Sequence, residues 1–503
     1  MLNLAMARTK DLLRSRKERQ CRVLFALFIG LTAQVDAVAS RTLSQPVSEA
    51  LQRAGVPLDA VALVVRDASG KDTLVSHNAA KPMNPASVIK LVTTAAALDL
   101  LGPAYTFKTE FYVRGELRNG VLDGDLYVKG HGDPKLTYER LWAAIRQLRE
   151  RGIREVRGDI VFDRTYFAPI VHDPAKFDGK ALRAYNVGPD ALMFNYKAVT
   201  YSFVPQDGSV SISAEPAIPS VEVASRIRLV NGACGDWQER LAPEIEENGL
   251  LATVQFSGSF SESCGEKAWS LGLFDHPRYN AALFRTLWNE AGGKIFGKSR
   301  DAGVPGDARL IFTIESPPLA DIVRDINKYS NNVMARQLFL TLSAEATGQP
   351  GETARSVEVL KAWLKHKGIE APELVLENGA GLSRVERISA NTLAALLQVM
   401  SGSALMPELI SSLPLVAVDG TMKKRMNGNG VAGQAHIKGG TLNEVRAIAG
   451  EVVDRNGKRW LVVFMVNHPN APAAQPVQDI LLQWIYAQDG PARCRNCLMK
   501  GVR

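Results

Sequence analysis

A long run of short strand patterns stands between segments of other periodicity, and this order restricts the folds open to the chain. Residues 108–275 alternate apolar and polar positions in short stretches broken by Gly, Asp and Pro, which predicts a β-rich region. Further strand patterns lie towards the two ends of the chain, at 60–67, 72–78, 446–454 and 458–468. Helical patterns follow the β-rich region, at 278–293, 319–342, 353–368 and 390–400. One α/β (α+β) domain interrupted by a β-rich insert fits this order.

The length also supports more than one domain, since 503 residues exceed what a single hydrophobic core usually organises. We predict one discontinuous domain from residues 40–107 and 276–490, with residues 108–275 as the insert. A leader, residues 1–39, precedes this domain, and a polar tail, residues 491–503, follows it.

The leader has the features of a secretory signal peptide. A segment with seven Lys and Arg residues is followed by an apolar run at 23–33 and by Ala37-Val38-Ala39, an A-x-A-like cleavage site. The apolar run is too short for a comfortable membrane span. An uncleaved anchor is the alternative, because the basic segment is long.

The net charge gives little support for a polyanionic partner. Residues 1–40 hold seven basic and three acidic residues, so they account for four units of the formal charge of +8. The remaining body is only mildly basic, which argues against a nucleic-acid-binding protein.

The cysteines agree with export. Cys234 and Cys264 are 30 residues apart in a polar strand-and-loop region, and a disulfide between them would close a loop worth roughly 3 kcal/mol. Cys494 and Cys497 lie in the tail, where two cysteines cannot form a structural zinc site alone. Their use stays unassigned.

Two short motifs match nucleotide-binding patterns in letters only. Residues 292–299 read G-x-x-x-x-G-K-S, but a helical pattern precedes them, whereas a phosphate loop needs a buried strand before it and a helix after it. Residues 428–433 read G-x-G-x-x-G but lead into a strand pattern. The seven histidines show no H-x-H or H-x-x-x-H spacing, so we expect neither a cofactor nor a metal.

Ser87 and Lys90 carry the chemistry that we consider strongest. They stand at the start of an apolar helical pattern that runs to about residue 101, three positions apart and therefore on one helix face. A desolvated lysine loses proton affinity and can activate a serine hydroxyl, which is a poor nucleophile without a base. Taken alone, however, the pair is better explained by a capping serine and a lysine that reaches solvent, because S-x-x-K should occur by chance roughly once in a chain of this size.

Two distant segments favour the catalytic interpretation. Ser330-Asn331-Asn332 interrupts a helical pattern with residues that form helices poorly, and it supplies a hydroxyl for proton transfer and an amide for a peptide. Lys438-Gly439-Gly440-Thr441 ends a strand pattern, where glycine allows a close approach of the ligand backbone and lysine adds a positive charge.

In this order, S-x-x-K, S-x-N and K-x-G form the motif set of penicillin-binding proteins and serine β-lactamases. The chain resembles the class C low-molecular-mass penicillin-binding proteins, the D-alanyl-D-alanine carboxypeptidase/endopeptidase family (peptidase family S13), over nearly all of residues 45–488. The matching segments are 84–98, 130–137, 158–167, 185–192, 327–335, 377–384, 418–425 and 436–442. The resemblance implies a β-lactamase/transpeptidase-like fold, an antiparallel sheet flanked by helices, with a large insert between the first two motifs.

The resemblance also implies roles for individual residues. Ser87 is the expected nucleophile and Lys90 its base, while Ser330 and Lys438 relay a proton to the departing D-alanine and Asn332 orients the peptide. The expected substrate-binding residues are Gly440, Thr441 and Asp163, the last of which would meet the free ammonium of the diamino acid in the stem peptide.

The expected partners are peptidoglycan stem peptides and β-lactams, which would acylate the protein, in the periplasm. We also list a homodimer and a peripheral membrane contact as expectations. Gly439 departs from the usual K-T-G pattern and removes a hydroxyl that would help to hold the substrate carboxylate. This change makes a catalytically weakened peptidoglycan-binding protein an alternative function. A β-lactamase is a further alternative, against which the large insert argues.

Overall fold

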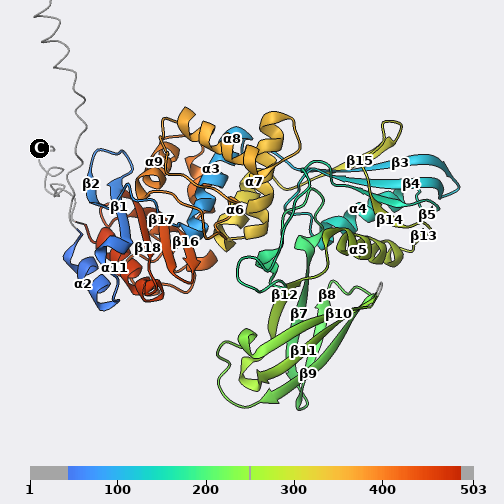
Figure 1. The fold of residues 1–503 in the computed structure, drawn as a ribbon, viewed down its shortest axis with the longest axis horizontal. Coiled ribbons are helices and arrows are strands. Elements are labelled where there is room, and N and C mark those ends of the chain that lie inside the picture. Colours follow the sequence, from blue (N-terminus) through green and yellow to red (C-terminus); the bar gives the residue numbers. More distant parts are fainter. Residues whose placement is uncertain (1–42, 249–250, 489–503) are drawn as a thin grey trace, which may run out of the picture. The chain divides into compact units, whose positions relative to one another are not determined.

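The computed structural model of the protein describes residues 43–248 and 251–488 (Figure 1). The expected signal peptide, Cys494 and Cys497 lie outside this part of the chain. Across the described residues, no helix combines the length and the apolar character that crossing a membrane requires.

A five-stranded antiparallel sheet forms the centre of the discontinuous domain (Figure 1). Its strands, in spatial order, are β16 (Ala435–Leu442), β17 (Val445–Val453), β18 (Arg459–Asn467), β1 (Val61–Asp67) and β2 (Thr73–His77). Strand β1 pairs with β18, so the first and last strands of the described chain lie side by side. The pairs β1–β2 and β17–β18 form where the sequence shows neighbouring strand patterns, and Asn456-Gly457, a dipeptide typical of tight hairpins, lies between β17 and β18.

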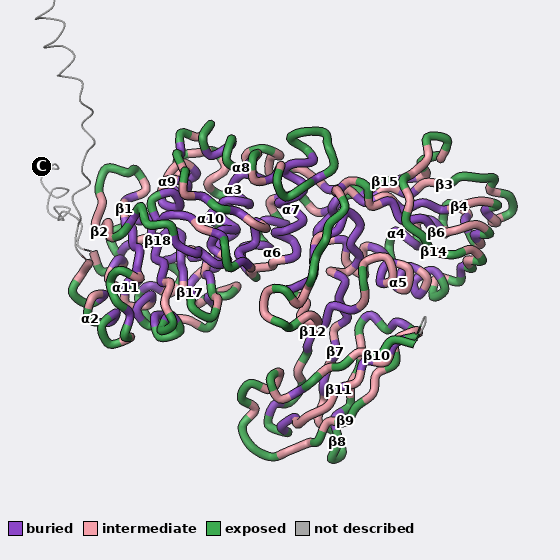
Figure 2. The backbone as a smooth tube through the Cα atoms, viewed as in Figure 1, coloured by how far each residue is buried: buried purple, intermediate pink, exposed green. Residues whose placement is uncertain are grey.

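Helices cover both faces of this sheet because side chains alternate along each strand. Val61, Leu63 and Val65 point into a core that includes residues of α2 (Gln45–Arg53) and α11 (Gln475–Tyr486). Ala62 and Val64 point into the opposite core. The helices of that second core are α3 (Lys90–Leu100), α6 (Leu319–Tyr329), α7 (Asn332–Thr347), α8 (Thr353–His366), α9 (Ala390–Ser401) and α10 (Met406–Ser412). The predicted fold class, an antiparallel sheet flanked by helices, is confirmed, and both cores appear as buried backbone in Figure 2.

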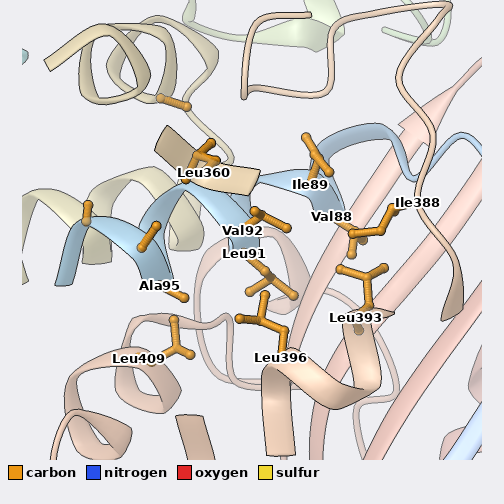
Figure 3. Packing of buried hydrophobic residues seen from close by; sticks show 14 of the residues in the cluster. Val88, Ile89, Leu91, Val92, Ala95, Leu360, Ile388, Leu393, Leu396 and Leu409 are labelled. Carbon is orange, nitrogen blue, oxygen red and sulfur yellow. The ribbon is translucent and has the colours of Figure 1, made fainter. Parts of the chain in front are cut away.

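Helix α3 lies in the middle of the second core. Every residue from Lys90 to Leu98 is buried. Figure 3 shows Leu91 and Val92 among side chains from other helices, including Leu360 of α8 and Leu396 of α9. A helix that is apolar on all sides is stable only when other elements surround it, so its one amine, Lys90, is forced into the interior.

The insert contains a second, mixed sheet of seven strands. The strands are β3 (Lys108–Arg118), β4 (Val121–Gly130), β5 (Glu155–Val156), β6 (Ile160–Asp163), β13 (Lys294–Ile295), β14 (Ser299–Asp301) and β15 (Arg309–Glu315). Helices α4 (Tyr138–Glu150) and α5 (His276–Glu290) contribute Leu141 and Leu283 to its core.

This sheet continues past residue 275, where the sequence placed the end of the insert. Strand β15 pairs with β3, and β13 and β14 pair with β5 and β6. Strands β13 and β14, with two and three residues, are too short to show an alternating pattern, whereas β15 has seven residues. The stretch 292–299 that resembles a phosphate loop forms β13 and the start of β14, and strand β15, not a helix, is the next element.

Two three-stranded sheets form the rest of the insert. One contains β7 (Ala198–Gln206), β8 (Ser209–Glu215) and β12 (Lys267–Gly272), and the other contains β9 (Val221–Val230), β10 (Leu241–Asn248) and β11 (Leu251–Ser261). Phe203 of the first sheet contacts Phe256 of the second, with ring centroids 5.0 Å apart. A disulfide joins Cys234 to Cys264 across 30 positions and links the loop after β9 to the turn after β11.

Candidate active site

Ser87 lies in a tight turn directly before the central helix. Residues Ala86–Ile89 form a 3-10 helix, and α3 begins only at Lys90, three residues later than the sequence pattern indicates. The turn starts at Ala86, whose φ of 46° is left-handed, and the Asn84 side chain accepts a hydrogen bond from the Ala86 N–H at 2.9 Å. Side chains three positions apart eclipse in a 3-10 helix, so the turn stacks Lys90 against Ser87.

The Lys90 side-chain nitrogen joins three segments of the chain. Its Nζ donates to Ser87 Oγ at 2.9 Å and to Asn332 Oδ1 at 2.6 Å. A third hydrogen bond goes to the carbonyl oxygen of Ala380. Because the three acceptors come from separate elements, the position of the amine is determined by tertiary structure and not by α3 alone.

The surroundings of Lys90 favour its neutral form. Burial is the largest cause that lowers its pKa well below the ordinary value, and the positive charges of Lys438 and Arg336 lower the pKa further. The carboxylate of Glu386 acts in the opposite direction. A neutral amine in hydrogen-bond contact with a hydroxyl can take its proton, which is the role of a general base.

Ser330 occupies a break in what the sequence presents as one long helix. Helix α6 ends at Tyr329, Ser330 has a left-handed φ of 56°, and α7 begins at Asn332. The Asn331 side chain caps α7 by accepting a hydrogen bond from the Met334 N–H at 3.1 Å. Serine and asparagine favour such caps over helix interiors, and the break directs Ser330 and Asn332 to two different lysines.

The second lysine, Lys438, stands on β16 and has no exposed surface. Its Nζ donates to Ser330 Oγ and to the Gly439 carbonyl oxygen, both at 2.9 Å. Burial lowers the pKa of Lys438 to about 7. The site therefore holds two lysine–serine pairs, and each buried amine is poised to exchange a proton with its hydroxyl.

Lys438 makes a testable contribution to stability. Its amine loses a proton near pH 7 in the folded state but only near 10.5 in the unfolded chain. The unfolded state thus binds more protons in this interval, and the free energy of unfolding should rise with pH there. Lys438→Met is expected to flatten that rise when urea unfolding is measured at a series of pH values. Lys423→Met, at an exposed lysine, should leave it unchanged; equal slopes for wild type and Lys438→Met would contradict the assignment.

The glycines that follow Lys438 differ in the space around them. A Cβ added at Gly440 would lie 2.6 Å from the carbonyl oxygen of Pro85 and 3.1 Å from the backbone nitrogen of Ser87. A Cβ added at Gly439 would meet no atom within 4 Å. Strand β16 therefore contacts the Ser87 turn at Gly440. Gly439 faces open space, and Thr441 is exposed.

The loop 377–386 is part of the site, and we did not predict a chemical role for it. Its Ala380 carbonyl accepts from Lys90, and a Cβ at Gly381 would collide with the Ala86 carbonyl oxygen at 2.1 Å. The buried Glu386 holds the loop through backbone N–H groups. The spacing of residues in the sequence does not predict that Glu386 holds this loop, because its hydrogen-bond partners are main-chain N–H groups, which nearly every residue has.

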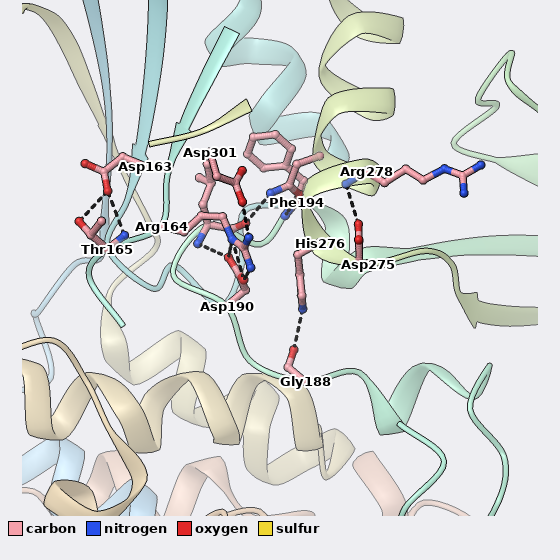
Figure 4. A network of polar contacts seen from close by, with 12 residues as sticks. Asp163, Arg164, Thr165, Gly188, Asp190, Phe194, Asp275, His276, Arg278 and Asp301 are labelled. Carbon is pink, nitrogen blue, oxygen red and sulfur yellow. Dashed lines mark hydrogen bonds and ion pairs between the residues drawn. The ribbon is translucent and has the colours of Figure 1, made fainter. Parts of the chain in front are cut away.

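Asp163 is not part of this hydrogen-bonded cluster. It ends β6, is 2% exposed, and accepts from the Thr165 N–H and hydroxyl at 2.9 and 2.7 Å and from the Val304 N–H at 2.8 Å. Figure 4 shows it beside the ion pairs of Arg164 with Asp190 and Asp301. The hydrogen-bond partners of Asp163 in the described chain all belong to the insert, so its expected contact with a substrate ammonium stays a prediction.

Comparison with known proteins places this chain in a family. The family model "D-Ala-D-Ala carboxypeptidase 3 (S13) family" matches residues 43–488. A D-alanyl-D-alanine carboxypeptidase of Actinomadura sp. (strain R39) is 30% identical over 451 residues, which cover 83% of this chain and 80% of that protein. The D-alanyl-D-alanine carboxypeptidase DacB of Haemophilus influenzae is 23% identical over 416 residues, 81% of this chain and 85% of the relative.

Solved structures agree in fold. The crystal structure of penicillin binding protein 4 (dacB) from Haemophilus influenzae superposes with a TM-score of 0.73 at 22% identity, and covers 88% of this chain and 100% of that one. A structure of the same protein complexed with a β-lactam gives a TM-score of 0.69 with the same identity and coverage. Since the family model spans most of the sequence, the chain belongs to the D-Ala-D-Ala carboxypeptidase 3 (S13) family.

Proposed function

We propose that the protein is a serine D-Ala-D-Ala carboxypeptidase that acts through an acyl-enzyme on Ser87. The observation that carries this proposal is the contact between Lys90 Nζ and Ser87 Oγ, 2.9 Å long, with the lysine fully buried and its pKa lowered. A hydroxyl becomes an effective nucleophile when a base of matched proton affinity lies within hydrogen-bond reach. The names of the relatives supply the substrate class.

In the acylation step, Ser87 Oγ attacks the carbonyl carbon between the two D-alanines while Lys90 Nζ takes the hydroxyl proton. We assign the Ser87 and Thr441 backbone N–H groups to the resulting oxyanion, as the family resemblance implies. The bond to the terminal D-alanine then breaks. Its nitrogen receives a proton from Ser330 Oγ, which Lys438 Nζ can resupply across 2.9 Å.

Water then hydrolyses the ester on Ser87. For this step, Lys90 first gives up the proton that it took from Ser87, to solvent or to the Ser330–Lys438 pair, and becomes neutral again. It then takes a proton from the water that attacks the ester, and it returns this proton to Ser87 Oγ as the acid product leaves. The Asn332 Oδ1 accepts from Lys90, so its amide N–H groups are the part of the side chain left to orient the peptide. The same chemistry would cut a peptide cross-link if the chain after the scissile bond were longer, and on this basis we include endopeptidase action in the proposal.

Peptidoglycan stem peptides are the proposed substrates and β-lactams the proposed covalent inhibitors, with the periplasm as the proposed location. A β-lactam presents a strained amide to the same nucleophile, and the complex reported for the Haemophilus influenzae protein supports this assignment. The expected signal peptide supports export.

Gly439 favours a second candidate, a peptidoglycan-binding protein with weakened catalysis on the same fold. Apart from Gly439 itself and its two chain neighbours, no atom of the described structure lies within 4 Å of a Cβ placed at residue 439. Thr441 is then the hydroxyl left to do part of the work of the missing threonine. Binding of wall fragments by both wild type and Ser87→Ala, with no turnover by wild type, would favour this candidate.

Mass spectrometry after incubation with a β-lactam tests the main proposal. We expect an adduct of the mass of the intact β-lactam on the peptide that contains Ser87, and none in Ser87→Ala. Ser403→Ala, at a turn between α9 and α10, is the matched control and should be labelled like wild type. An unlabelled wild-type protein, or labelling that persists in Ser87→Ala, would contradict the assignment.

A further inference from the structure

Glu386 is a buried carboxylate beside the proposed base, and no step described above uses it. It is fully buried, and it lies at the base of a loop that one isolated β-bridge closes, Val375 with Arg387, while a second bridge pairs Met83 with Ile388. The second bridge ties this base to the segment that leads into the Ser87 turn. Glu386 therefore belongs to the support of the catalytic cluster and not to a distant part of the core.

One carboxylate oxygen of Glu386 organises the loop. Its Oε1 accepts hydrogen bonds from three consecutive backbone N–H groups, those of Glu377, Asn378 and Gly379, at 3.1, 3.0 and 3.1 Å. Successive N–H groups that converge in this way form a concave site that favours an anion. The loop conformation consequently depends on a negatively charged acceptor at residue 386.

The loop contacts both Lys90 and the turn that contains Ser87. Two further bonds fix its next residues: the Thr93 hydroxyl donates to the Gly379 carbonyl at 2.8 Å, and the Ala380 N–H donates to Asn378 Oδ1 at 2.9 Å. The Ala380 carbonyl then accepts from Lys90. The next residue, Gly381, packs so closely on the Ser87 turn that an added Cβ would lie 2.7 Å from the Ser87 nitrogen.

We propose that Glu386 is a positioning residue of the reaction, which holds loop 377–381 so that it seats Lys90 and Ser87 and which supplies the buried counter-charge of Lys90. This inference rests on the proposed function, in which Lys90 is the base. The hydrogen bonds that link Glu386 to the loop, and the loop to Lys90, all lie in the described part of the chain. A carboxylate differs here from a neutral acceptor because its charge acts on the buried amine of Lys90 and on the buried guanidinium of Arg336.

The charges around Lys90 predict how the site responds to loss of this counter-charge. Burial, Lys438 and Arg336 lower the pKa of Lys90, and Glu386 raises it, while Glu377 acts on Arg336 from the same loop. Burial raises the pKa of Glu386 itself, and the N–H groups and Lys90 oppose that shift. Removal of the Glu386 charge should therefore lower the pKa of Lys90 further.

The test is the rate of Ser87 acylation by a fluorescent penicillin, measured against pH for wild type, Glu386→Gln and Glu386→Ala. Glutamine keeps an acceptor oxygen but removes the charge, so the ascending limb of the profile should move to lower pH by about one unit. Alanine also frees the three N–H groups, so the plateau rate should fall about tenfold or more. Glu373→Gln is the matched control, since Glu373 accepts from the Ser389 N–H and the Thr392 hydroxyl at the start of α9. Its profile should match wild type.

The outcomes separate this inference from the proposed function. The role of Glu386 is overturned if the ascending limb of the pH–rate profile of Glu386→Gln coincides with that of wild type. It is also overturned if Glu386→Ala acylates as fast as wild type. If Glu386→Ala does not fold, the position of the limb in Glu386→Gln decides alone, because a residue that only stabilises the fold would not move it. Failure of wild type to acylate at any pH would instead overturn the proposed function.

Discussion

Replacing Lys90 with methionine is expected to slow acylation of Ser87 by about a hundred- to ten-thousandfold, the range that general-base catalysis contributes. The lysine is the one amine in hydrogen-bond contact with Ser87 Oγ among the described residues, at 2.9 Å. Methionine fills a similar volume and needs no hydrogen-bond partner in the buried site, so helix α3 should stay packed. Stopped-flow or gel measurement of labelling by a fluorescent penicillin gives the rate, and thermal unfolding checks the fold.

Lys197→Met is the matched control for this change. Lys197 is also buried, at 8% exposure, and its Nζ donates to the Phe274 carbonyl at 2.5 Å within the insert. Burial lowers its pKa to about 8, so the two variants remove chemically similar amines. Acylation by Lys197→Met should match wild type. If Lys90→Met acylates within about threefold of wild type, Lys90 is not the base and the proton must leave Ser87 by another route.

Introducing threonine at Gly439 is expected to raise turnover of a D-Ala-D-Ala peptide by about ten- to a hundredfold. A hydroxyl at this position would add one hydrogen bond to the substrate carboxylate, worth about 1.5–3 kcal/mol if it forms in the transition state. The structure has room for the side chain, because an added Cβ meets no atom within 4 Å. Threonine also suits a β-strand, and residue 439 lies within β16. Release of D-alanine measures the effect.

The neighbouring glycine provides the contrast. Gly440→Ala adds a smaller group, but its Cβ would lie 2.6 Å from the Pro85 carbonyl oxygen, so β16 or the Ser87 turn must shift. Displacement of the reacting groups by a fraction of an ångström should reduce acylation about tenfold or more. Wild-type turnover in Gly439→Thr would show that the missing hydroxyl does not limit this protein, and would refute the view that Gly439 weakens catalysis.

Several local features could be predicted because they depend on neighbours in the sequence. The apolar run after Lys90 predicts a buried helix, and α3 is buried from Lys90 to Leu98. The Asn456-Gly457 signal predicts the β17–β18 hairpin, in which Gly457 has a left-handed φ of 80° and Asp454 closes the turn by donating its N–H to the Lys458 carbonyl. Strands β13 and β14 were not predicted, because they owe their pairing to partner strands and not to a pattern of their own.

The sequence by itself determined the residue types of the site and one spacing, that of Ser87 and Lys90, because three positions along a helical turn bring two side chains together wherever the turn occurs. Only the tertiary structure decided what those residues can do. The pKa of Lys90 is lowered by burial under distant helices and by Lys438 from the far end of the chain. Its position depends on Ala380, held by Glu386 through main-chain N–H groups that leave no mark in a sequence. Proton affinity and orientation arise from charges and dipoles close in space, and no local pattern records them.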